Sequence, residues 1–208
     1  MKMKQLCYAA SILAAVLSLS AAELKTNEVK HSCCQPMDAS LKGLPEKSVY
    51  QLETVWTNDQ NQAMQLSALK GRPQIVVMFF ASCQYTCPII VHQLKQLEEA
   101  LPLGVRTNVG FTLASFDSKR DTPAALKDFR AQHTLPQLNW TLLNGDADGV
   151  ADLAAVLGVK FKQGAQGQFA HSNVITLLNA QGEIVYQQIG LNPENQELVP
   201  RIEKLETH

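Results

Sequence analysis

The chain has 208 residues, which suits one globular domain with length left over for a terminal extension. Its 18 basic and 19 acidic residues give a net charge of −1, so there is no basic field, and this argues against nucleic acid as a partner. Hydrophobic residues make up 46% of the sequence, which is enough to bury an ordinary core.

Residues 1–22 have the layout of a secretory signal peptide. Two lysines near the start precede an apolar run over residues 6–19, and small residues follow at positions 20–22. We expect cleavage after Ala22, and the alternative is an uncleaved N-terminal anchor. The sequence therefore predicts an exported protein, located in the periplasm as a soluble domain or anchored by its N-terminus to the inner membrane.

Residues 23–47 are predicted to be a flexible lead segment, because they are rich in polar and turn-forming residues and poor in large apolar ones. This segment contains four side chains that could capture copper or exchange disulfides: His31, Cys33, Cys34 and Met37. The alternative is an incidental cysteine pair. Export places all cysteines of the mature chain in an oxidising compartment, and close pairs suit redox exchange or soft-metal binding better than a framework of disulfides.

The chain from residue 48 to the end alternates between strand and helix patterns. Strands are predicted at residues 49–56, 75–80, 109–116, 138–143, 174–178 and 183–189. Helices are predicted at residues 83–101, 121–133, 149–157 and 193–205, with a helical turn at 66–71 and a polar loop at 162–167. This order indicates a mixed α/β sheet with helices on both faces, ending in a hairpin and a helix.

Cys83 and Cys87 lie four positions apart, directly after a predicted buried strand. On a helix, that spacing puts both thiols on one face about 6 Å apart, and with Cys83 in the preceding loop they can also meet in a disulfide. The positive end of a helix lowers a thiol pKa, and two soft thiolates match Cu(I). The alternative is a structural disulfide or two inert core thiols.

Four sequence blocks resemble, in order, the SCO/SenC family of copper chaperones. The blocks are VVMFFASCQYTCP, FDSKRDTPAALKDF, WTLLNGDADGVADLAAVLGV and FAHSNVITLLNAQGEIVYQQIG, and they fall within residues 48–205. The resemblance implies a thioredoxin-like fold over residues 48–208. The sequence departs from the family pattern at Gln84, where many members have proline. This difference leaves both cysteines in place.

The resemblance also implies a site and a function. Copper would be bound by Cys83, Cys87 and His171, as Cu(I) and also as Cu(II). The protein would deliver copper, or reducing equivalents, to the binuclear copper site of cytochrome c oxidase. The implied partners are that oxidase subunit or another copper carrier, together with thiol–disulfide reductants, and the chain is expected to be a monomer. Asp117 matches the first aspartate of the second block and would lie near the copper, with a turn-forming carboxylate as the alternative.

Three other functions use the same residues or the same fold. A thiol–disulfide oxidoreductase would use Cys83 and Cys87 without metal, but ordinary thioredoxin-like reductases have C-x-x-C and a facing proline, and no proline occurs between Pro136 and Pro193. A peroxiredoxin-type peroxidase needs a threonine and an arginine around its cysteine, and we find no such pattern. A passive copper reservoir would need a lead segment that binds several ions. We therefore expect primarily a metallochaperone, with thiol–disulfide reductase as the main alternative.

Overall fold

The computed structural model describes residues 43–164, 168–191 and 197–206. Within these residues, seven strands form one sheet in the order β2-β1-β5-β4-β3-β8-β9, and β6 pairs with β7 in a separate ribbon. The strands of the large sheet are β1 Val55–Asn58, β2 Ala63–Gln65, β3 Gln74–Phe79, β4 Gly110–Ser115, β5 Trp140–Asn144, β8 Val174–Leu178 and β9 Ile184–Ile189. The ribbon consists of β6 Phe161–Gln163 and β7 Phe169–His171.

The centre of the large sheet is parallel and fully buried. Strand β4 pairs in parallel with β3 and with β5, whereas β8 and β1 are added antiparallel on either side. Every residue of β3 and β4 is buried, because helices cover both faces of the sheet. The mixed sheet flanked by helices and the terminal hairpin predicted from the sequence are therefore confirmed.

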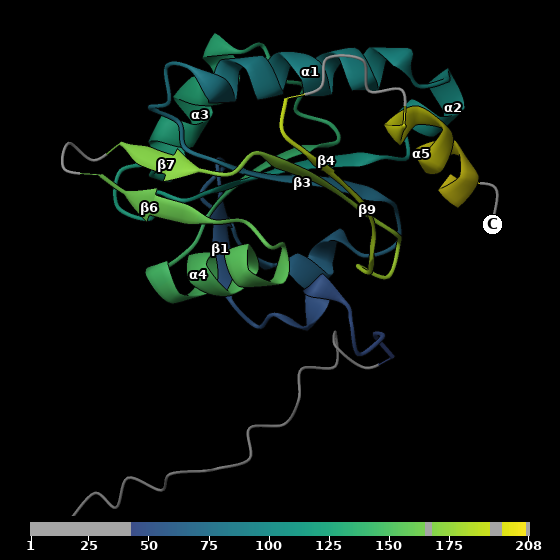
Figure 1. The fold of residues 1–208 in the computed structure, drawn as a ribbon, viewed down its shortest axis with the longest axis horizontal. Helices are drawn as coiled ribbons and strands as arrows, with labels where there is room; N and C mark the ends of the chain where they lie inside the picture. Colours follow the sequence, from purple (N-terminus) through teal and green to yellow (C-terminus); the bar gives the residue numbers. More distant parts are fainter. Residues whose placement is uncertain (1–42, 165–167, 192–196, 207–208) are drawn as a thin grey trace, which may run out of the picture. The chain divides into compact units, whose positions relative to one another are not determined.

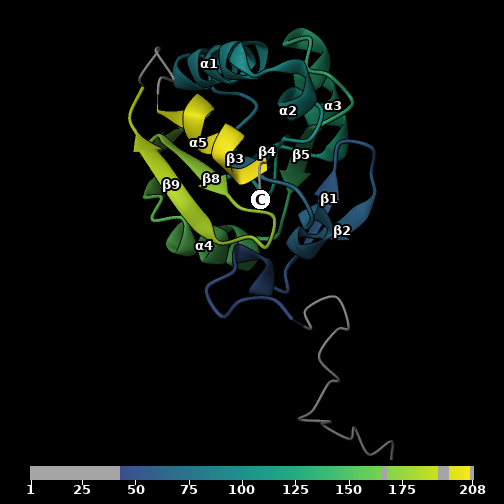
Figure 2. The same cartoon turned by 90° about the vertical axis from the view of Figure 1, so that its right-hand side faces the viewer.

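The helices are α1 Thr86–Ala100, α2 Leu103–Arg106, α3 Pro123–Gln132, α4 Ala147–Val156 and α5 Leu198–Glu206. Figure 1 shows α1 and α3 above the sheet and α4 below it. In Figure 2, β8 and β9 form one edge of the sheet, and β1 and β2 form the other.

Capping side chains set the starts of α3 and α4. The Thr122 side chain accepts the Ala125 N–H at the start of α3, and Pro123 occupies the first helical position as predicted. The Asp146 side chain accepts the Gly149 N–H, so α4 begins two residues before the predicted start.

The strand predicted at residues 49–56 is wrong in its first half. Residues Val49–Gln51 form a 3-10 turn, η2, and the strand begins only at Val55. Val49 and Tyr50 are both buried, which a strand with one solvated face does not allow for neighbouring residues. The Ser48 side chain accepts the Tyr50 N–H and stabilises the turn. The predicted helical turn at 66–71 is confirmed as η3, Leu66–Leu69.

The polar loop predicted at residues 162–167 is also wrong in part. Lys162 and Gln163 belong to β6, which pairs antiparallel with β7 in the register Phe161↔His171. Both strands have three residues and are partly exposed, so neither has the apolar run that identifies a buried strand.

The first described residues join the domain at one end of the sheet, and Cys83 lies at the other end. The Val49 N–H donates to the Gly182 carbonyl at 2.8 Å, in the hairpin between β8 and β9. Leu178 at that end of β8 pairs with Gln74, the first residue of β3. Cys83 lies in the loop that follows Phe79, the last residue of the same strand.

Two groups of predictions lie outside the described residues. They concern the signal peptide at 1–22 and the candidate ligands His31, Cys33, Cys34 and Met37 of the lead segment. In the part of the chain that the structure describes, no helix is long and apolar enough to cross a bilayer.

Candidate metal centre

Cys83 and Cys87 are placed by the junction between β3 and α1. The Cys83 N–H donates to the Phe80 carbonyl at 3.1 Å and closes a turn directly after β3. Helix α1 begins at Thr86, so Cys83 lies in the loop before it and Cys87 in its first turn. The helix therefore starts three residues later than predicted. Cys87 is fully buried, whereas Cys83 is partly exposed.

His171 reaches the two cysteines from the β6–β7 ribbon, where it is the last residue of β7. Its ring packs against Phe116, with centroids 5.0 Å apart, and against Phe80, with centroids 6.0 Å apart. Its Nδ1 lies 3.2 Å from the Ser172 carbonyl oxygen. Because a carbonyl oxygen can only accept, Nδ1 carries the proton and the lone pair of the neutral ring is on Nε2.

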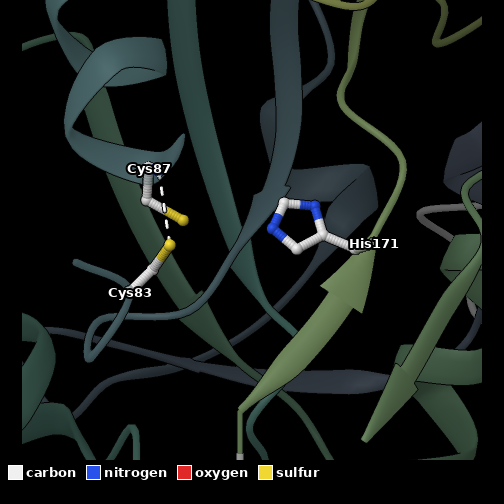
Figure 3. A group of neighbouring side chains, drawn as sticks. All are labelled: Cys83, Cys87 and His171. Carbon is white, nitrogen blue, oxygen red and sulfur yellow. Dashed lines mark hydrogen bonds between the residues drawn. The ribbon is translucent and has the colours of Figure 1, made fainter. Parts of the chain in front are cut away.

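The three side chains form one group of soft metal ligands. Figure 3 shows the two sulfurs facing each other and the imidazole ring facing both of them. One ligand atom from each of Cys83, Cys87 and His171 lies within 4.8 Å of the others. Metal bonds of about 2.0–2.3 Å to nitrogen and sulfur, as found for zinc, place two ligands at most about 4.6 Å apart, so small movements would close this group around an ion.

This set of ligands fits copper better than zinc. Two thiolates and an imidazole are soft and borderline ligands, which Cu(I) accepts in low coordination number. Structural zinc sites take four protein ligands. Among the residues that the structure describes, no other His, Cys, Asp or Glu joins the group.

The two thiols differ in acidity. Burial tends to raise the pKa of Cys83, but hydrogen bonds from the Thr86 hydroxyl and from the Cys87 and Tyr85 backbone outweigh it and lower that pKa. The Cys83 sulfur accepts the Cys87 N–H at 3.5 Å, at the positive end of α1. Burial raises the pKa of Cys87 well above its usual value. The pair therefore combines an accessible, more acidic thiol with a buried, protonated one.

Asp117 is not part of this group of ligands. Its side chain accepts the Arg120 N–H at 3.1 Å and forms an ion pair with the Arg120 guanidinium. These contacts close the turn after β4, which is the alternative that the sequence analysis kept for this residue. The neighbouring Phe116 does contact the His171 ring.

Some residues around the centre were not identified from the sequence. Phe80 and Phe116 enclose the imidazole, and Asp121 accepts the Ala81 N–H at 2.8 Å beneath the loop that holds Cys83. Asp121 belongs to the FDSKRDTP block, where it could have been noticed as a second carboxylate beside Asp117.

A family model described as SCO1/SenC matches residues 45–206, which is most of the chain. The chain belongs to the SCO1/SenC family. The match includes the metal centre, all described strands and all described helices. It begins three residues before the domain boundary predicted at residue 48.

One relative of this SCO1/SenC chain is a protein of Stutzerimonas stutzeri to which copper binding is ascribed. The two sequences are 27% identical over 143 residues, which make up 67% of this chain and 68% of that protein. Among solved structures, a SCO1/SenC family lipoprotein from Bacillus anthracis superposes with a TM-score of 0.68 at 23% identity, over 74% of this chain and 94% of that one. Copper-bound ScoI from Bradyrhizobium japonicum superposes with a TM-score of 0.62 at 20% identity, over 73% and 96% of the two chains. These structures share the fold, which is thioredoxin-like.

Proposed function

We propose that this SCO1/SenC protein is a periplasmic copper chaperone that carries Cu(I) between Cys83, Cys87 and His171. The observation that carries the proposal is the grouping of these three ligand atoms within 4.8 Å in a chain of this family. The copper ascribed to the Stutzerimonas relative and bound in the Bradyrhizobium structure supports it. The recipient that we propose is the binuclear copper site of cytochrome c oxidase, reached directly or through another copper carrier.

The unequal exposure of the ligands suits transfer of the ion. Cys87 is fully buried and Cys83 is partly exposed, so an incoming ligand of the partner meets the Cys83 side first. Replacing one thiolate at a time keeps Cu(I) coordinated throughout, and the ion is never released to water. The hollow beside Cys83, of about 430 Å³, gives a partner side chain room to approach and is lined by Phe80, Gln84, Tyr85, Thr86, Gln168 and Phe169.

A second function is favoured by the difference in acidity between the thiols. The Cys83 thiolate could attack a substrate disulfide and release one substrate thiolate. Cys87 would then lose its proton, attack the Cys83 sulfur and release the second substrate thiolate. The protein would be left with a Cys83–Cys87 disulfide, and an external dithiol reductant would have to restore it. This reductase activity on oxidase cysteines is compatible with copper delivery.

Copper binding is expected to depend on the redox state of the pair. In the Cys33→Ser, Cys34→Ser background, which removes the lead-segment thiols, the reduced protein should bind one equivalent of Cu(I). Oxidation removes two protons and two electrons to form the Cys83–Cys87 disulfide, which leaves no thiolate ligand, so binding should be lost. Copper stoichiometry by atomic absorption after desalting measures both states.

Equal copper binding by the oxidised protein would contradict this redox dependence. A reduced protein that binds no copper but reduces disulfides catalytically would replace the chaperone by the oxidoreductase. Delivery itself is tested by mixing the copper-loaded protein with the copper-free domain of the oxidase subunit. After the two proteins are separated, the copper content of the oxidase domain, measured by atomic absorption, should have risen as that of the donor fell.

Cu(I) affinity is expected to rise with pH. Cys87 holds its proton at neutral pH because burial raises its pKa, so copper must displace at least that proton. The affinity should therefore increase about tenfold per pH unit for each proton released. Burial lowers the pKa of His171 below 6.5, with the Ser172 hydrogen bond opposing it, so the imidazole stays neutral and keeps its role as a ligand at mildly acidic pH.

Competition with a Cu(I) chelator between pH 6 and 8 measures this slope. The His92→Ala variant is the matched control, because it removes an exposed histidine of α1 outside the group of ligands and its slope should equal that of the parent chain. An affinity independent of pH would show that both thiols are already ionised without copper.

A further inference from the structure

Asp121 connects the two central strands directly beneath the metal centre. Its side chain is buried, with 2% of its surface exposed. One carboxylate oxygen, Oδ2, accepts the Ala81 N–H at 2.8 Å and the Ser115 hydroxyl at 2.5 Å. Ala81 lies just after β3, and Ser115 is the last residue of β4. A single oxygen atom therefore joins the carboxyl ends of two parallel strands.

The carboxylate is itself held from several directions. The Ser115 hydroxyl that donates to it also accepts the Asp117 N–H at 2.9 Å. The Asp121 N–H donates to the Asp117 carbonyl at 3.1 Å, and the Asp121 carbonyl accepts the Asn144 side-chain amide at 2.5 Å. Asn144 is the last residue of β5, so the ends of all three parallel strands are connected through Asp121.

The Ala81 N–H belongs to the turn that carries Cys83. Ala81 and Ser82 are the two central residues of the turn closed by the hydrogen bond from the Cys83 N–H to the Phe80 carbonyl. Cys87, by contrast, lies in the first turn of α1, and its thiol is hydrogen-bonded to the Phe80 backbone directly after β3. The position of the Cys83 sulfur relative to Cys87 therefore depends on how firmly this turn is held.

We propose that Asp121 is a positioning residue that holds the Phe80–Cys83 turn in place, so that the Cys83 sulfur stays apart from Cys87 and open to a metal. A disulfide requires the two sulfurs to approach to about 2.05 Å, whereas an ion between them needs them farther apart. Fixing the turn favours the separated pair over the disulfide. The inference rests on the proposed copper site, but its effect on the thiol–disulfide equilibrium exists without copper.

Asp121→Ala tests the proposal in the full chain with Cys33→Ser and Cys34→Ser. We expect Cu(I) affinity to fall by about tenfold or more, the size of effect typical for residues that orient metal ligands. Equilibration with reduced and oxidised glutathione should show a shift of several-fold toward the Cys83–Cys87 disulfide, in the reaction of one disulfide with two glutathiones to give a dithiol and oxidised glutathione. Asp121→Asn should restore both values to within about threefold, because the amide oxygen still accepts both hydrogen bonds.

Thr112→Val is the matched control. It removes the buried Thr112 hydroxyl of β4, which links β4 to β3 as Asp121 does, but at the opposite end of β3. This hydroxyl donates to the Gln74 side chain at 3.2 Å. This variant should lower the melting temperature and leave both copper affinity and the glutathione equilibrium unchanged.

The proposal is overturned if Asp121→Ala lowers the melting temperature but leaves both readouts within twofold of the parent chain. If Asp121→Ala does not fold, Ser115→Ala decides by the same two readouts, because it removes one of the two hydrogen bonds to Oδ2. A parent chain that binds no Cu(I) would refute the proposed function, and the glutathione equilibrium would still decide the role of Asp121.

Discussion

Replacing Cys87 with serine is expected to abolish tight Cu(I) binding. Cys87 is fully buried and lies in the first turn of α1, and no other His, Cys, Asp or Glu of the described residues joins the group to take its place. A serine hydroxyl has nearly the same size, but it is a hard ligand that stays protonated at neutral pH, and Cu(I) prefers thiolates. The loss should therefore come from chemistry and not from a change in packing.

The three ligand variants should form a graded series. Cys83→Ser is expected to match Cys87→Ser, because each leaves one thiolate. His171→Ala leaves both thiolates, and Cu(I) tolerates low coordination, so we expect a smaller loss of about 10- to 100-fold, by analogy with the loss of groups that support a metal site. Competition with a Cu(I) chelator at fixed pH, in the background lacking Cys33 and Cys34, measures all three affinities.

His92→Ala is the matched control for the histidine variant. His92 is exposed on α1 and lies outside the group of ligands, so its replacement should leave the affinity unchanged. A Cys87→Ser protein that still bound one Cu(I) with the parent affinity would show that the metal site is elsewhere in the chain.

The second large effect concerns stability. Arg130 on α3 and Asp59, which directly follows β1, form a buried ion pair, with Nε 2.6 Å from Oδ2 and Nη2 3.0 Å from Oδ1. Arg130 also donates to the Trp140 carbonyl at 2.9 Å. Arg130→Met should lower the free energy of unfolding by about 3–5 kcal/mol, because it leaves the Asp59 carboxylate buried without a partner. Urea unfolding followed by circular dichroism measures this change.

A double variant distinguishes the lost pair from lost packing. Asp59→Asn combined with Arg130→Met removes both charges, so it should be less destabilised than the sum of the two single changes. The hydrogen bonds of Arg130 described above go to Asp59 and Trp140 and not to a proposed copper ligand. The folded variants should therefore keep their Cu(I) affinity. Additive effects of the two substitutions would show that the ion pair itself contributes little.

The sequence was most informative where local pattern and burial coincide. The apolar runs that became β3 and β4 are buried on both faces, so their character is visible without knowing their neighbours. Thr122 and Pro123 mark the start of α3 because capping depends on residues close in sequence. Elements of this kind could be predicted within a few residues.

The features that could not be predicted from local sequence depend on contacts with residues far along the chain. The strands β6 and β7 have three residues each and are stabilised by pairing with each other and by aromatic packing against Phe116. The hydrogen bond that the Ala81 N–H donates to the Asp121 carboxylate joins residues 40 positions apart, and no local pattern encodes it. His171 had no distinctive pattern of its own, so only the family resemblance pointed to it. Its approach to Cys83 results from the tertiary position of the ribbon.

The described N-terminal residues join the sheet at the end opposite the copper ligands. Val49 is bonded to the β8–β9 hairpin, beside the first residue of β3, and Cys83 follows the last. A strand of six residues is about 20 Å long, so Val49 and Cys83 are separated by about the length of β3. Copper exchange at Cys83 and the attachment of the described N-terminal residues therefore use opposite ends of the sheet, so a partner can reach the Cys83 side without displacing Val49.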